Sequence, residues 1–128
     1  MSIKFRSVNR VNPQDVEAPQ KFYATAVGDG RTDFKRLAKL ISMQCTVSKA
    51  DCLAVLSSLE ENVIMELQEG RIVDLGELGT FQVGILSEGR DTTEEINANV
   101  VKKARLRFRP GKEFKRMLKA GLDFQKID

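Results

Sequence analysis

The stretch Leu75-Gly76-Glu77-Leu78-Gly79-Thr80-Phe81-Gln82-Val83 decides the architecture that the sequence predicts. Its glycines indicate a turn, and apolar residues then alternate with polar ones, which is the period of a β-strand. Ile72 precedes the turn, so the stretch is typical of a β-hairpin. Further along the chain, Leu106 and Phe108 alternate with arginines until a Pro-Gly pair ends the segment. We therefore expect a return strand over residues 100–109.

Two helices are predicted before this stretch. The first, over about residues 33–44, carries apolar residues at the spacing of one buried face. The second follows Ser48, which resembles a capping residue with Asp51 three positions later, and ends near Glu69, before Gly70. Its apolar stripe is broad enough to contact more than one surface, and the chain has only 6% aromatic residues, so we expect a dimer. The stripe comprises Cys52, Leu53, Val55, Leu56, Leu59, Val63, Ile64 and Leu67.

Both ends of the chain are predicted to add short elements. Residues 3–10 and 22–27 have strand patterns, and the turn-rich segment 12–19, with two prolines, separates them. Residues 113–120 read as a short helix, and residues 122–127 are compatible with an edge strand that pairs with the N-terminal strands. We therefore divide the chain into an N-terminal β appendage (1–30), a central domain (31–121) and a C-terminal strand (122–128), in the α+β class.

Charge is unevenly distributed, although the net charge is only +3. The segment 102–119 contains nine basic residues and one acidic residue, whereas most charged residues in the segment 60–95 are acidic. In the return strand, alternation places the guanidinium groups of Arg105, Arg107 and Arg109 on one face, which suits a row of phosphates. Binding of this kind is steeply salt-dependent and largely independent of base sequence.

The sequence carries no pattern that is typical of an enzyme. Neither a nucleophile with a base nor a carboxylate pair on a rigid frame is visible, and no glycine spacing fits a phosphate cradle. Cys45 and Cys52 lie seven residues apart and histidine is absent, so a Cys/His zinc site is excluded, and we interpret both as reduced packing thiols. No apolar run approaches the roughly 18 residues of a membrane span, and no signal peptide is visible. We expect no cofactor, metal, small-molecule substrate or membrane partner, and a cytoplasmic location.

The predicted order of elements, from the two helices to the short helix after Pro-Gly, resembles the HU and integration-host-factor family of bacterial histone-like proteins over about residues 32–120. The opening stretch and Phe108-Arg109-Pro110-Gly111-Lys112 carry this resemblance. The additions at both ends resemble a Bacteroides-type subgroup. The resemblance implies a homodimer with a helical core and two β-ribbon arms on double-stranded DNA, in a nucleoid-associated role in DNA condensation. It implies these DNA-binding residues: Lys102, Lys103, Arg105, Arg107, Arg109, Lys112 and Lys115.

The predicted arm tip, residues 89–99, departs from the family. It has no proline to wedge between base steps, and Asp91, Glu94 and Glu95 repel phosphates. We therefore expect less DNA bending than in the family. The alternative function is a dimeric HU-like structural or protein-interaction module with weak or no DNA bending.

Three aromatic residues and two glycines are interpreted as structural residues. Phe81 and Phe108 alternate inward and are expected in the core, rather than as platforms for bases, and Tyr23 is expected to be a packing residue. Gly79 and Gly111 are expected to serve the geometry of the backbone.

Overall fold

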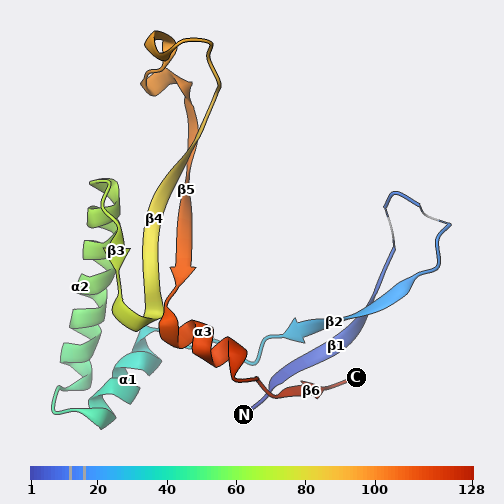
Figure 1. Ribbon diagram of the computed structural model, residues 1–128. Helices are drawn as coiled ribbons and strands as arrows, with labels where there is room; N and C mark the ends of the chain where they lie inside the picture. Colours follow the sequence, from blue (N-terminus) through green and yellow to red (C-terminus); the bar gives the residue numbers. More distant parts are fainter. Residues whose placement is uncertain (12, 16) are drawn as a thin grey trace. The chain divides into compact units, whose positions relative to one another are not determined.

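The computed structural model describes residues 1–11, 13–15 and 17–128 (Figure 1). Its residues form two compact units, one of Met1–Asp33 with Met117–Asp128 and one of Phe34–Arg116. Each unit contains a three-stranded sheet, and the second also contains two long helices, which confirms the α+β class. The predicted connector 12–19 includes Asn12 and Val16, which lie outside the described residues.

The sheet of the first unit joins the two ends of the chain. Its strand order is β2-β1-β6, with β1 antiparallel to β2 and parallel to β6. The backbone N–H and the hydroxyl of Ser7 donate to the Asp128 carboxylate at 2.9 and 2.7 Å, and these bonds lower the pKa of that carboxyl. Both N-terminal strands and the pairing of the C-terminal strand with them are as the sequence predicted. Their bounds are Ile3–Arg10 for β1, Lys21–Val27 for β2 and Phe124–Lys126 for β6.

The two predicted helices are confirmed as α1, Phe34–Gln44, and α2, Lys49–Gln68. The Ser48 hydroxyl accepts from the backbone N–H of Asp51 at 3.1 Å, so Ser48 caps α2 as expected. Gly70 ends the helix with a φ of 82°. No helix in the described part of the chain has both the length and the hydropathy needed to cross a bilayer.

Both cysteines are free thiols, but only one of them packs in the interior. Cys52 is buried between α1 and α2, near Ile41, Val47 and Leu56, whereas Cys45 is exposed. The interpretation of Cys45 as a packing thiol is therefore wrong, because the α1–α2 connection holds it at the surface. Burial is the largest cause that raises the pKa of the Cys52 thiol, and the neighbouring Cys45 raises this pKa further.

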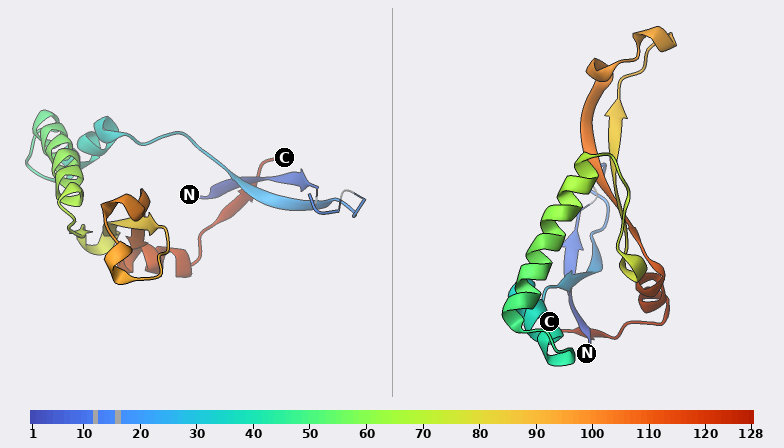
Figure 2. Two further views of the ribbon diagram at one scale, coloured as in Figure 1. Left: turned by 90° about the horizontal axis from the view of Figure 1, so that it is seen from above. Right: turned by 90° about the vertical axis from the view of Figure 1, so that its left-hand side faces the viewer.

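The sheet of the second unit has the order β3-β4-β5 and is antiparallel throughout. A short 3₁₀ turn at Gly76–Leu78 joins β3 to β4, as the hairpin pattern predicted. The long ribbon of β4 and β5 extends beyond the end of α2, and residues 88–100 lie at its far end (Figures 1 and 2). The bounds are Val73–Asp74 for β3, Gly79–Ser87 for β4 and Val101–Pro110 for β5, and α3 follows at Lys112–Lys119.

The two glycine motifs meet at the base of this ribbon. The backbone N–H of Gly111 donates to the carbonyl of Leu78 at 2.9 Å. A Cβ on Gly111 would clash with the backbone of Glu77, and one on Gly79 with the backbone oxygen of Arg109. The φ of Gly79 is also positive, at 139°. Both glycines therefore allow two backbone segments to lie close together, in agreement with the predicted role in backbone geometry.

A single copy of the chain buries little apolar surface. Among the described residues, the only buried hydrophobic ones are Ala38, Cys52 and Val100, and no large side chain is fully buried. The chain exposes 10970 Å². Two separate compact domains of the sizes of the two units would together expose about 8,000 Å². The chain thus exposes more surface than two compact domains of these sizes, and the division into two units does not explain the difference.

Several burial predictions are therefore wrong for the single chain. Phe81 is half-buried and packs on Phe108 with ring centroids 4.9 Å apart, yet Phe108 remains 44% and Leu106 60% exposed. The apolar stripe of α2 and the apolar residues of α3 are also partly exposed in the single chain. For α2 this exposure does not contradict the sequence-based expectation, which was a stripe broad enough to contact more than one surface. Tyr23, expected to be a packing residue, is 46% exposed.

Candidate nucleic-acid interface

The register of the β4–β5 ribbon separates charged from apolar side chains. Partners across an antiparallel pair point to the same face, and successive residues point to opposite faces. Phe108 pairs with Phe81 and Leu106 with Val83, so these four residues share one face. The intervening arginines lie on the other face, which confirms the predicted alternation. Their partners are Gly84 for Arg105, Gln82 for Arg107 and Thr80 for Arg109.

Four of the seven candidate residues form one row on this face. Lys103, opposite Leu86, continues the line of Arg105, Arg107 and Arg109. Alternate residues of a strand lie about 7 Å apart, so the row extends over about 20 Å. Lys102 is not in the row: the register shifts between Leu86 and Ser87, which leaves it without a cross-strand partner. Lys112 and Lys115 follow on α3, three positions apart.

The candidate cations differ from Arg71 and Arg116 in having no carboxylate partner among the described residues. All seven are exposed, and none of them makes an ion pair with a described residue. By contrast, Arg71 lies 2.8 Å from Glu66, and Arg116 lies 3.2 Å from Glu113. The residues opposite the three ribbon arginines carry no charge. The row is therefore an uncompensated positive surface, which attracts a line of anions.

Sequence reasoning did not single out Gly84, although the structure gives it a role. A Cβ at this position would lie 2.9 Å from Nε of Arg107, so the Arg107 side chain passes directly over the glycine. Beside this arginine, Gln82 and Thr80 line a hollow of about 550 Å³. A glycine within an otherwise alternating strand pattern was the available signal for close approach of another group at this position.

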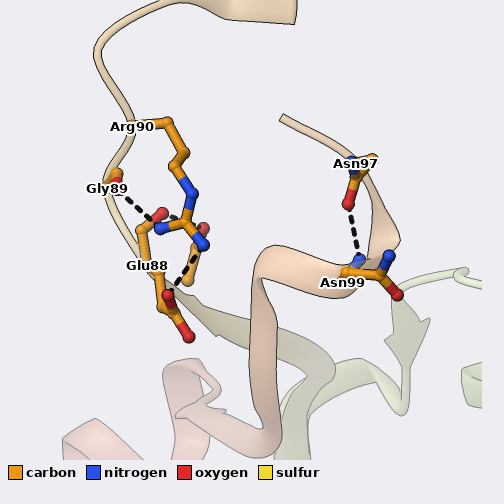
Figure 3. A network of polar contacts seen from close by, with 6 residues as sticks. Glu88, Gly89, Arg90, Asn97 and Asn99 are labelled. Atoms are coloured by element: carbon orange, nitrogen blue, oxygen red, sulfur yellow. Dashed lines mark hydrogen bonds and ion pairs between the residues drawn. The ribbon is translucent and has the colours of Figure 1, made fainter. Parts of the chain in front are cut away.

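The arm tip is a compact turn structure held by side-chain contacts (Figure 3). Nη1 of Arg90 donates to the carbonyl of Gly89 at 2.8 Å, and Nη2 lies 2.9 Å from the Glu88 carboxylate. On the other side of the tip, the side-chain oxygen of Asn97 accepts from the backbone N–H of Asn99 at 2.9 Å. These contacts neutralise Arg90, so this cation adds little to the positive surface of the ribbon.

One apolar side chain is presented by the arm tip. Ile96 is 52% exposed and directly follows the short 3₁₀ turn Thr93–Glu95. Isoleucine is among the residues that can wedge between base steps in other proteins. Here Glu94 and Glu95 immediately precede it, and their carboxylates oppose the approach of a phosphate backbone.

Comparisons with known proteins identify the family. No relative is found among curated protein sequences. A crystal structure from Bacteroides vulgatus ATCC 8482, of a protein provisionally assigned as a bacterial DNA-binding protein, is similar with a TM-score of 0.64 and 14% identity. The similarity covers 99% of this chain but 50% of that one, so this chain spans half its length, and the likeness shows the fold alone. The family HU-HIG, described as an HU domain fused to wHTH, Ig, or Glycine-rich motif, matches residues 1–126. Because this match extends over nearly the whole sequence, the chain belongs to the HU-HIG family.

Proposed function

We propose that this protein is a histone-like protein that binds duplex DNA without marked sequence preference, through the row Lys103, Arg105, Arg107 and Arg109. The observation that carries the proposal is that these exposed cations lie on one face of a ribbon without carboxylate partners. Each neutralised phosphate releases condensed counterions, which makes the affinity salt-dependent. Membership of an HU family and the provisional assignment of the structural neighbour support DNA as the partner. In this proposal Lys102, Lys112 and Lys115 flank the row, and the protein binds rather than catalyses.

The proposed active form is a homodimer. Several large apolar side chains are strongly exposed in one copy, including Val55 at 63%, Ile64 at 52% and Leu106 at 60%. Burial of such residues by a second copy is favourable by about 25 cal/mol for each Å² removed from water. Because the exposed residues lie on α2 and on the apolar face of the ribbon, the proposed dimer interface and the proposed DNA surface use opposite faces of the sheet.

The proposed role is architectural, at the nucleoid in the cytoplasm, with residues 31–121 as the DNA-binding part and 1–30 and 122–128 as additions. We expect little bending of the duplex, because Glu94 and Glu95 stand beside the exposed Ile96. These acidic residues also favour the second candidate function, an HU-like module that interacts with proteins and bends DNA weakly or not at all.

Mobility shifts with duplexes of unrelated sequence over a salt series test the proposal. We expect dissociation constants of about 1 to 100 micromolar near physiological salt, similar for all sequences and weaker at higher salt. Energy transfer between labels at the two ends of a short duplex is expected to change little on binding. Absence of binding to every duplex at low salt would contradict DNA binding and leave the interaction module as the function.

A further inference from the structure

The N-terminal sheet carries a second group of cations on one of its faces. In the register of β1 and β2, Arg6 pairs with Thr25, Val8 with Tyr23 and Arg10 with Lys21. Because partners and alternate residues share a face, Arg6, Arg10, Lys21 and Tyr23 lie on the same side of the sheet. The guanidinium carbon of Arg10 lies 5.3 Å from the centre of the Tyr23 ring, which places these two side chains in contact. We call these four residues the β1–β2 basic face.

The charges of this face are not balanced within the described chain. Arg10 and Lys21 are directly opposite each other, and like charges in that position destabilise a sheet. Neither they nor Arg6 form an ion pair with a described residue, whereas Lys4 on the same face lies 3.5 Å from Asp29. A bound anion would relieve the repulsion that the pairing creates.

Beside these cations lies a hollow that could hold an apolar or aromatic group. Its volume is about 640 Å³, and Tyr23, Arg10 and Lys21 line it. The other described residues that line it are apolar, namely Val11, Pro13, Ala18 and Pro19. The Tyr23 side chain is available at this site, since the residue is 46% exposed.

From this juxtaposition we infer that the β1–β2 basic face binds single-stranded nucleic acid. A single strand offers both features that the face would recognise, a phosphate for each cation and an unstacked base for the ring and the hollow. A duplex keeps its bases stacked inside and offers only its backbone here. This site is separate from the ribbon row and goes beyond the proposed duplex binding.

Fluorescence anisotropy of the full chain with labelled oligo-dT, oligo-U and a duplex tests the inference. Tyr23→Leu is expected to weaken single-strand binding at least about fivefold, since a stacked base contributes that much or more, whereas Tyr23→Phe retains it. Arg6→Gln with Arg10→Gln is expected to lower the salt slope by about 0.7 for each lost phosphate contact. Phe22→Leu is the matched control, because Phe22 pairs with Asn9 on the opposite face of the sheet. The relative affinities for oligo-dT and oligo-U identify which single strand the face prefers.

The outcomes separate this inference from the proposed function. We expect Arg105→Ala with Arg107→Ala to weaken duplex binding and keep single-strand binding. The inference is wrong if that variant also loses single-strand binding, or if the Arg6 and Arg10 double variant binds oligo-dT and oligo-U as the parent does. Neither outcome counts against the proposed binding of duplex DNA. Because Arg6 and Arg10 are exposed, that double variant serves even if Tyr23→Leu fails to fold, which circular dichroism would reveal.

Discussion

Leu59→Ala is expected to weaken the proposed dimer strongly. Leu59 lies in the middle of α2 and is 43% exposed in one copy, so a little under half of the residue's surface is available to a partner. A Leu→Ala change at a fully buried site costs about 2–5 kcal/mol, which scales here to about 1–2 kcal/mol per copy. In a two-fold symmetric dimer the change occurs twice, so dimer formation loses about 2–4 kcal/mol. The dissociation constant then rises about 30- to 1,000-fold.

Sedimentation velocity over a concentration series measures this change directly. The parent is expected to sediment as a dimer at micromolar concentration, and Leu59→Ala to shift toward a monomer of 14.4 kDa. Glu61→Ala is the matched control, because Glu61 is exposed, lies two positions away on nearly the opposite side of the helix, and is outside the apolar stripe. A parent that sediments as a monomer would contradict the proposed dimer, and a Leu59→Ala variant that dimerises as well as the parent would show that Leu59 is not in its interface.

Three further predictions concern stability, charge and thiol chemistry. Gly111→Ala is expected to lower the free energy of unfolding by about 3 kcal/mol or more in thermal or urea unfolding, because the added Cβ meets backbone that cannot move aside. Gly89→Ala is the control, because a Cβ there would lie in open space. Charge reversal of Glu94 and Glu95 to Lys is expected to tighten duplex binding in mobility shifts, and unchanged affinity would place the arm tip away from the DNA. Cys45 is expected to be alkylated first in mass spectrometry, since Cys52 is buried and its raised pKa keeps the thiol protonated to higher pH.

Local patterns predicted most of the secondary structure. Alternation over β4 and β5, and the helical spacing of α1 and α2, depend only on which residues must share a face, and the structure contains all four elements. The roles of Gly79 and Gly111 were also predictable, because a glycine between two strand or helix patterns usually marks a special backbone geometry.

The burial of side chains on the ribbon and the conformation of the arm tip were less predictable from the sequence. Periodicity shows that Leu106 and Phe108 share a face, but it cannot show whether one copy of the chain covers that face. The turns of residues 88–100 depend on specific contacts, such as that of Arg90 with Glu88, which have no periodic signal. Likewise, the sequence cannot show that Arg105 and Arg107 have no carboxylate partner among the described residues, whereas Arg71 has one.

A salt titration of duplex binding by the Arg105→Ala and Arg107→Ala double variant tests whether the ribbon row binds DNA. Its matched control is Arg71→Ala with Arg116→Ala, which removes the same charge from arginines that already have carboxylate partners. We expect the ribbon variant to bind all sequences more weakly, with a salt slope lower by about 0.9 for each lost phosphate contact, and the control to bind nearly as the parent does. Equal affinities and equal slopes for the two variants would show that the ribbon row is not the DNA surface.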